Sequence, residues 1–149
     1  MTVGTGRYLV DTNLVSEAVK PRPSPAVLDW LGAQPDEALF ISALTLAELR
    51  RGILEKEPGR RRRELEAWFT GPEGPRALFI GRILAFDERA ALEWGRLMAE
   101  GTAAGRPRSA LDMVLAATAA ARGLVVATAN ERHFRDAGVP WLNPMAPGN

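Results

Sequence analysis

Apolar residues occur along this chain as short continuous runs that alternate with longer stretches of helical spacing. Five runs have the length of buried strands, and they are Arg7–Asp11, Ala38–Ser42, Arg82–Phe86, Leu124–Thr128 and Val139–Leu142. A short helical stretch begins after the turn at Thr12. Longer helical stretches cover 25–33, 45–56, 60–69, 88–103 and 110–122. Strands that alternate with helices form parallel βαβ units, so we expect a three-layer α/β/α sandwich with a mainly parallel central sheet.

Residues that start and stop helices support these boundaries. Asp87 and Ser109 stand at N-cap positions, and Gly123 stands where a helix with a left-handed C-terminal residue ends. The Gly71–Pro75 segment, rich in glycine and proline, is predicted to be a flexible insertion.

The length of the chain bounds the number of domains. A chain of 149 residues with 46% apolar and 25% charged side chains has the balance of one ordinary globular domain. We therefore expect a single domain over 1–149, with flexible ends at about 1–6 and 145–149.

Composition excludes several classes of function. The chain contains no cysteine and one histidine, His133, which excludes thiolate and multi-histidine metal sites and disfavours a Ser-His-Asp triad. The longest nearly apolar run, Ala110–Ala121, is short for a bilayer and contains Asp112. With no signal-peptide pattern at the amino terminus, we expect a cytoplasmic protein without a membrane segment.

Four polar residues fall at the predicted carboxyl edge of the sheet, where α/β proteins bind ligands. Asp11 ends the first strand, Glu48 and Asp112 lie in first turns of helices, and Asn130 follows the fourth strand. Three carboxylates at one edge repel each other unless a cation lies between them. Oxygen ligands without histidine or sulfur favour Mg²⁺, for which Mn²⁺ can substitute.

Each of these residues also has a structural interpretation. Glu48 can complete a Thr-x-x-Glu capping box with Thr45, and Asp112 a similar Ser-x-x-Asp box with Ser109. Asp11 and Asn130 can simply begin turns. The functional interpretation therefore depends on all four residues meeting at one edge.

Four ordered motifs carry a resemblance to a known family. They are Tyr-Leu-Val-Asp11-Thr-Asn13, Ile-Ser-Ala-Leu-Thr-Leu-Ala-Glu48-Leu-Arg-Arg-Gly52, Ser-Ala-Leu-Asp112 and Val-Val-Ala-Thr-Ala-Asn130-Glu-Arg-His-Phe134. In order and spacing they resemble PIN-domain ribonucleases of the VapC type, which are toxins of bacterial toxin–antitoxin modules. The resemblance extends from about Tyr8 to Pro144.

The resemblance implies a Mg²⁺- or Mn²⁺-dependent endoribonuclease that a cognate VapB-like antitoxin holds inactive, and a toxin homodimer. By motif position, Asp11, Glu48 and Asp112 would be the metal-binding catalytic acids. Five further residues would shape the site, and they are Thr12, Asn13, Ser109, Thr128 and Glu131.

One position departs from the family pattern. The fourth acidic position often holds aspartate, whereas this chain has Asn130, with Glu131 beside it. Asn130 is kept as a candidate catalytic residue, and the alternative is that Glu131 supplies the fourth carboxylate.

Arginine side chains are candidates for contacts with RNA phosphates. Arg50 and Arg51 lie within one helical turn of Glu48 and are the first candidates. The run Arg60–Arg63 is another, but its alternative is a solvated helix face paired with Glu64 and neighbouring acids.

Three competing functions remain open. A phosphohydrolase with a nucleophilic Asp11 usually has an acid two residues later, where this chain has Asn13. A nucleotide-binding module lacks its phosphate-binding glycine loop here. A catalytically weak binding protein that has kept the fold is the third, and Asn130 is the residue that favours it.

Overall fold

The computed structural model describes residues 6–146 and contains a five-stranded sheet. All strands run parallel, in the order β3-β2-β1-β4-β5. Their bounds are Tyr8–Val10 (β1), Leu39–Ser42 (β2), Ile83–Leu84 (β3), Val125–Ala127 (β4) and Trp141–Leu142 (β5). The five strands occur where the apolar runs predict them, although each is shorter than its run.

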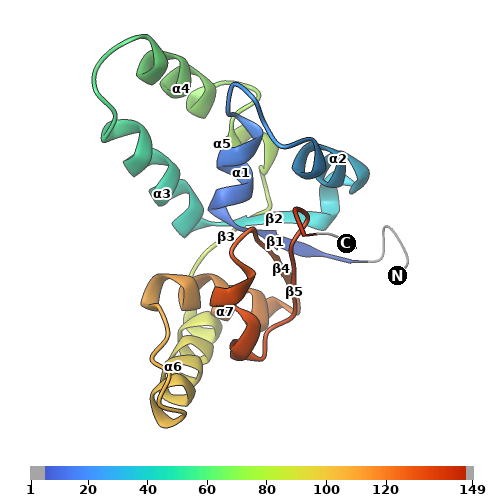
Figure 1. Ribbon diagram of the computed structural model, residues 1–149, viewed down its shortest axis with the longest axis vertical. Coiled ribbons are helices and arrows are strands. Elements are labelled where there is room, and N and C mark those ends of the chain that lie inside the picture. Colours follow the sequence, from blue (N-terminus) through green and yellow to red (C-terminus); the bar gives the residue numbers. More distant parts are fainter. Residues whose placement is uncertain (1–5, 147–149) are drawn as a thin grey trace.

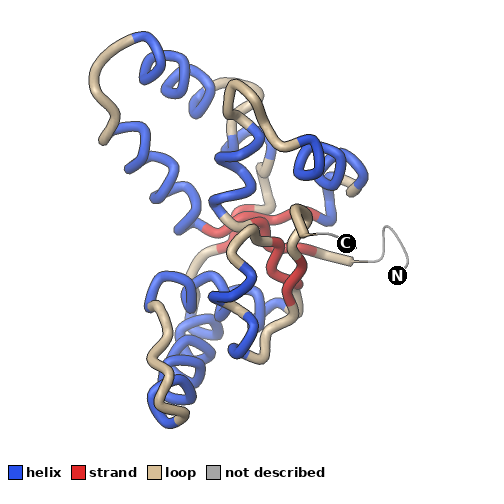
Figure 2. Tube along the Cα trace, viewed as in Figure 1, coloured by secondary structure: helices blue, strands red, loops and turns tan. Residues whose placement is uncertain are grey.

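Helices cover both faces of this sheet and confirm the predicted three-layer sandwich (Figure 1 and Figure 2). One face carries α1 (Thr12–Ala18), α2 (Pro25–Ala33), α3 (Ala43–Leu54), α4 (Arg60–Thr70) and α5 (Pro75–Leu78). The other carries α6 (Glu88–Ala103) and α7 (Ala110–Arg122). Three 3₁₀ turns complete the fold, η1 (Asp36–Ala38), η2 (Glu131–His133) and η3 (Arg135–Ala137).

Side chains alternate along the strands and feed two hydrophobic cores. In β1, Tyr8 and Val10 pack toward α1–α5, while Leu9 between them packs toward α6 and α7. In β4, Val126 joins Leu9 in the second core. Both faces of the central strands are therefore buried, which explains why their sequences are apolar without interruption.

Caps fix where the helices begin. Asp87 accepts a hydrogen bond from the Ala90 N–H, and Gly123 ends α7 with a φ of 66°, both as predicted. The helix predicted over Thr45–Lys56 instead begins at Ala43. It does so because the Ser42 hydroxyl caps it by accepting from the Leu44 N–H at 3.0 Å.

The Gly71–Pro75 segment is not the loose insertion that its composition predicts. Gly74 and Pro75 are buried, and the chain enters α5 at Pro75. A Cβ at Gly74 would lie 2.2 Å from the Trp68 carbonyl oxygen, so this turn is packed directly against the end of α4. Glycine is used here for close backbone approach.

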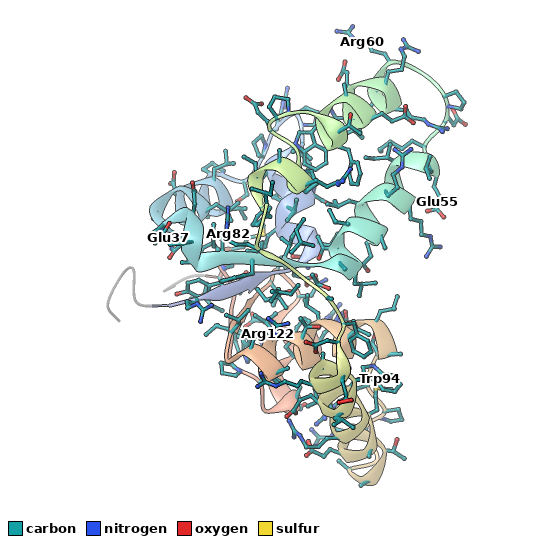
Figure 3. All side chains as sticks on the ribbon, turned by 180° about the vertical axis from the view of Figure 1, so that it is seen from behind. Glu37, Glu55, Arg60, Arg82, Trp94 and Arg122 are labelled. Atoms are coloured by element: carbon teal, nitrogen blue, oxygen red, sulfur yellow. The ribbon has the colours of Figure 1, made fainter. Side chains whose placement is uncertain are left out.

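The arginine-rich start of α4 lies at the outer end of the arm that α3 and α4 form (Figure 3). Arg60 pairs with Glu64 at 3.0 Å, Arg61 with the same carboxylate group at 3.5 Å, and Arg62 with Glu66 at 3.1 Å. This is the solvated, internally paired helix face that was the alternative to an RNA contact.

The described ends of the chain can be compared with the flexible ends predicted at 1–6 and 145–149. Asn143 accepts a hydrogen bond from the Met145 N–H, and its carbonyl accepts from the Ala146 N–H. Most of the two predicted segments, 1–5 and 147–149, lies outside the described residues. None of the helices in the described part of the chain combines the length and apolarity needed to cross a membrane.

Arg82 ties the edge of the sheet to the helices before it, on the side where β2 begins (Figure 3). Its guanidinium donates to the carbonyls of Asp36 at 2.5 Å and Leu39 at 2.6 Å, and to the Leu78 carbonyl. It also lies 5.3 Å from the centre of the Phe79 ring. One side chain thus donates to backbone carbonyls of η1, β2 and α5 and joins these three elements.

We expect Arg82→Ala to lower the free energy of unfolding by about 2 kcal/mol, because partly buried carbonyls lose a charged donor. Urea denaturation followed by tryptophan fluorescence measures the change. Arg76→Ala, an exposed arginine on α5, is the matched control and should change the free energy by less than about 0.5 kcal/mol. Equal losses in the two variants would contradict the role assigned to Arg82.

Candidate active site

The candidate site lies where the order of the strands reverses. β1 pairs with β2 on one side and with β4 on the other, so the connections after β1 and β4 diverge at this point. Asp11 directly follows β1, and Thr128 directly follows β4. In open α/β sheets this is the position at which ligands bind.

Asp11 is held by three hydrogen bonds. It caps α1 by accepting from the Thr12 N–H at 2.7 Å through Oδ1. Its Oδ2 accepts from the Asn13 amide at 3.0 Å and from the Thr128 hydroxyl at 2.8 Å. The carboxylate is therefore fixed between the start of α1 and the end of β4.

Asn13 and Thr128 join the two loops that follow β1 and β4. The Asn13 side chain donates to Asp11 and accepts from the Ala129 N–H at 3.1 Å, so both ends of its amide are used. The Thr128 hydroxyl, which is fully buried, accepts from the Asn130 N–H at 2.9 Å. Each loop thus fixes the other around Asp11.

Glu48 reaches this edge from α3. Its carboxylate accepts a hydrogen bond from the Thr12 hydroxyl at 2.6 Å, and that hydroxyl also lies 3.1 Å from the hydroxyl of Thr45. The capping-box interpretation of Thr45 and Glu48 is wrong, because Ser42 caps the helix and Thr45 is buried inside it. Glu48 accordingly lies in the second turn rather than the first.

Asp112 lies in the first turn of α7, as predicted. The Ser109 hydroxyl accepts from its backbone N–H at 3.3 Å, so Ser109 is the cap. The Asp112 carboxylate, however, lies 3.0 Å from Nδ1 of His133. Asp112 is thus paired with the one histidine of the chain, and its carboxylate is directed away from a closed capping box.

Asn130 and Glu131 differ in their surroundings. Asn130 is exposed, and its carbonyl accepts from the His133 N–H at 3.0 Å at the start of η2. Glu131 lies 3.4 Å from Arg135, one helical turn away. Which of the two supplies the fourth polar group of the site stays a prediction.

The three acids act on one another electrostatically. Burial raises the pKa of Asp11 above its ordinary value, and the charges of Asp112 and Glu48 raise it further, while the hydrogen bonds from Thr128 and Thr12 lower it. The three carboxylates therefore lie close enough for their charges to interact. Their convergence on one cation stays a prediction.

The donor chemistry of this edge fits a hard divalent cation. Every side-chain acceptor around Asp11 is an oxygen, from Glu48, Thr12, Asn13 and Thr128. Within residues 6–146, no three histidine, aspartate or glutamate side chains already form a ligand set around one point. Binding would therefore draw side chains together, with Asp112 leaving His133.

The two arginines proposed for RNA contacts are occupied elsewhere. Arg50 lies over the Phe69 ring of α4, 5.8 Å from its centre. Arg51 pairs with Glu55 at 2.9 Å, toward the outer end of α3 (Figure 3). Neither contacts the acidic edge, so their part in RNA binding stays a prediction.

Two residues of this network were not assigned to the site from the sequence. The sequence favours a loop position for His133, with the edge of the site as the alternative, and a capping role for Thr45. The spacing of Thr45 and Glu48 already places both on one face of the helix. The contact between His133 and Asp112 has no comparable signal, since 20 residues and one strand separate them along the chain.

Comparison with known proteins identifies the family. The PIN domain matches residues 8–140. The chain belongs to the PIN-domain family. VapC ribonuclease Y4jK of Sinorhizobium fredii is 39% identical over 93% of this chain and 98% of its own length. Toxin FitB of Neisseria gonorrhoeae is 36% identical over 91% of this chain and 96% of its own. Within the family, this PIN-domain protein is therefore of the VapC type.

Solved structures agree with this assignment. The crystal structure of FitAcB from Neisseria gonorrhoeae matches this PIN-domain chain with a TM-score of 0.86 and 35% identity, over 92% of this chain and 97% of that one. DNA-bound VapBC from Salmonella typhimurium matches with a TM-score of 0.75 and 26% identity, over 94% and 99%. The fold and the order of its elements are those of the family.

The raised pKa of Asp11 makes a prediction for the metal-free protein. An acid whose pKa is raised by folding contributes most to stability below its ordinary value of 3.8, and the contribution falls as pH rises through the raised pKa. We expect Asp11→Asn to remove this fall and to raise the Tm at neutral pH in EDTA by about 2–4 °C. Thermal unfolding monitored by circular dichroism measures it.

In the presence of a divalent metal, the wild type should have a higher Tm than Asp11→Asn, the reverse of the order in EDTA. Mn²⁺ binds the ionised carboxylates and should raise the Tm of the wild type more than that of Asp11→Asn. Glu37→Gln, an exposed acid at the opposite edge of the sheet (Figure 3), is the control and should behave like the wild type. A metal-free Asp11→Asn protein that is clearly less stable would mean that the hydrogen bonds to the carboxylate outweigh the repulsion.

Proposed function

We propose that this PIN-domain protein is an endoribonuclease that acts as the toxin of a toxin–antitoxin pair. The observation that carries the proposal is Asp11 at the strand-order reversal, where Thr12 donates hydrogen bonds both to Asp11 and to Glu48. Asp112 in the first turn of α7 is proposed as the third acid, and its charge and that of Glu48 help to raise the pKa of Asp11. The relative named VapC ribonuclease Y4jK, similar along nearly the whole chain, supports RNA as the substrate.

Metal dependence is general among PIN-domain ribonucleases of the VapC type, and the oxygen donors of this site favour Mg²⁺, with Mn²⁺ as a substitute. Asp11, Glu48 and Asp112 would hold the ion. When bound, it supplies a water of lowered pKa and neutralises charge on the scissile phosphate.

The remaining residues of the site orient these acids. Thr128 and Asn13 fix the position of the Asp11 carboxylate, because each donates a hydrogen bond to its Oδ2. Thr12 holds Glu48 in the same way. His133 holds Asp112 at the edge until a cation competes for the carboxylate. Ordered donors of this kind are typical of the shell around metal ligands.

A cognate antitoxin is the proposed protein partner. Structures similar to this chain are toxin–antitoxin complexes, among them FitAB bound to a DNA fragment. We propose that an antitoxin segment with a basic side chain covers the acidic edge, since the carboxylates there attract a positive charge. The homodimer, the single domain over 1–149 and the cytoplasmic location inferred from the sequence remain predictions.

The phosphohydrolase alternative has less support. That mechanism needs an acid two residues after Asp11 to protonate the leaving group, and Asn13 stands there instead. Its amide is fully engaged with Asp11 and Ala129. A catalytically weak binding protein remains the second candidate, and Asn130 at the rim is the observation that favours it.

We expect the purified free protein to cleave RNA only with Mg²⁺ or Mn²⁺, and Asp11→Asn to lose at least about 100-fold in turnover, because the substitution removes the central ligand charge. A gel assay with total RNA measures cleavage, and EDTA provides the metal-free condition. Glu37→Gln is again the matched control and should retain activity.

Two outcomes would count against the nuclease. Cleavage that persists in EDTA would exclude the metal mechanism. Absence of cleavage by free wild-type protein that still forms a tight antitoxin complex would support the binding protein. In the nuclease account, adding the antitoxin abolishes cleavage.

Asn130 is expected to contribute less than Asp11. An amide oxygen can ligate Mg²⁺ or orient a water, but it adds no charge. We expect Asn130→Ala to lower turnover by about tenfold or less, and Asn130→Asp to tighten Mn²⁺ binding in calorimetry. Equal and total loss in Asn130→Ala and Asp11→Ala would make Asn130 a primary catalytic residue. If Glu131→Gln by itself abolishes metal binding, Glu131 and not Asn130 fills the fourth acidic position.

A further inference from the structure

A cavity opens directly beside the candidate active site. It has a volume of about 570 Å³ and lies between the end of α6, the loop 106–109 and the turns η2 and η3. Asp112 and His133 form one end of it, so the cavity and the acidic edge share a wall. Its volume is within the range of pockets that hold a small ligand or one unit of a polymer.

The floor of this cavity is rigid. Arg108 is largely buried and donates to the carbonyls of Leu97 at 2.7 Å and Asp136 at 2.6 Å, which joins α6 to η3. Gly101 lies under the same side chain, and a Cβ there would come within 2.9 Å of its Cγ. The cavity is therefore built by packing and does not depend on a loop closing over it.

Arginine side chains also line the rest of the wall. Arg106 lines the cavity and pairs with Asp136 at 3.2 Å. Arg132 is exposed and lines the cavity next to His133. In the described range 6–146, no acidic side chain pairs with Arg132 and no hydrogen bond fixes its guanidinium. Arg132 is thus a cation within the cavity that no acidic side chain neutralises.

We propose that this cavity is a subsite for the RNA backbone, in which Arg132 binds the phosphate next to the one that is cleaved. The proposal rests on the ribonuclease function proposed above and adds where the strand lies. In this proposal the RNA strand runs from the acidic edge past Asp112 and His133 into the cavity. Arg132 accordingly joins Arg50 and Arg51 as a candidate for RNA contact.

The arrangement of charge favours a phosphate over an acidic peptide from a protein partner. The planar guanidinium matches two phosphate oxygens at once. The cavity opens onto the residues that would hold the reacting phosphate, so a strand bound at one is continuous with the other. The guanidinium matches a carboxylate as well as a phosphate, so this continuity with the acidic edge is what favours an RNA strand over an acidic peptide.

Binding without cleavage tests the proposal. The probe is a fluorescein-labelled single-stranded RNA of about 12 nucleotides and mixed sequence, titrated with the full-length free protein in EDTA and followed by anisotropy. We expect Arg132→Gln to weaken binding about five- to tenfold. The salt dependence of log K should become less steep by about 0.7, the loss of one phosphate contact.

Arg135→Gln is the matched control. It removes the same charge three residues away, from an arginine that pairs with Glu131 and lies outside the cavity wall. We expect less than about a twofold change for this variant. Equal effects of the two variants, or no effect of Arg132→Gln, would overturn the proposal, because binding would then report general charge only. Weaker antitoxin binding by Arg132→Gln with unchanged RNA affinity would assign the cavity to the protein partner and would also overturn it.

Failure of this inference is distinguishable from failure of the proposed function. If the wild type cleaves and binds RNA while Arg132→Gln binds it equally well, only the subsite is wrong. If the wild type neither cleaves nor binds RNA, the ribonuclease itself is wrong. In EDTA, Asp11→Asn should bind RNA at least as tightly as the wild type, because the acidic edge loses a negative charge, while in Mg²⁺ it should lose cleavage. Binding and chemistry are thus measured separately.

Discussion

The carboxylate of Asp11 is the constraint on which the rest of the site depends. It is buried at the end of β1, where a charged group is costly unless the protein supplies donors. The start of α1 supplies one donor, Thr128 another and Asn13 a third. Those donors come from two loops that diverge at the reversal of strand order, so the topology of the sheet sets the geometry of the charge. The charges of Glu48 and Asp112 add to the effect of burial in raising the pKa of Asp11, so we expect a cation to stabilise this edge.

Each of the two hydrophobic cores positions some of the polar side chains of the site. The core beneath α1–α5 places Thr12 and Glu48, because α3 begins at the carboxyl end of β2 and its buried face fixes the rotation of the helix. The core beneath α6 and α7 places Asp112 and His133, since α7 is buried along most of its length. A divalent ion at the edge would therefore join the two halves of the sandwich. Arg132 and the arginine-lined cavity belong to the second half, where we propose that they bind RNA outside the acidic edge.

Much of this fold could be predicted from the sequence, because the signals are local. Continuous apolar runs marked the five strands, and Asp87, Ser109 and Gly123 marked helix ends by their own backbone preferences. The helix at 43–54 was predicted to begin two residues late, since either Ser42 or Thr45 can cap a helix and only burial of Thr45 decides between them. The packed turn at Gly74 was missed for a similar reason: glycine permits a loose loop and a close contact equally well. Contacts between distant segments, such as Asp112 with His133 or Arg82 with three carbonyls, leave no pattern in one sequence.

The central claim is that acids from β1, α3 and α7 share one divalent cation at the carboxyl edge of the sheet. A crystal structure of the free protein grown with MnCl₂ tests it directly, because anomalous scattering locates manganese independently of any assumed ligand. The account predicts one well-occupied peak in contact with Asp11 and Asp112, with Glu48 nearby and the Asp112 carboxylate turned away from His133. Manganese bound at another edge of the sheet, or absent from an edge whose carboxylates are fully ionised, would contradict it.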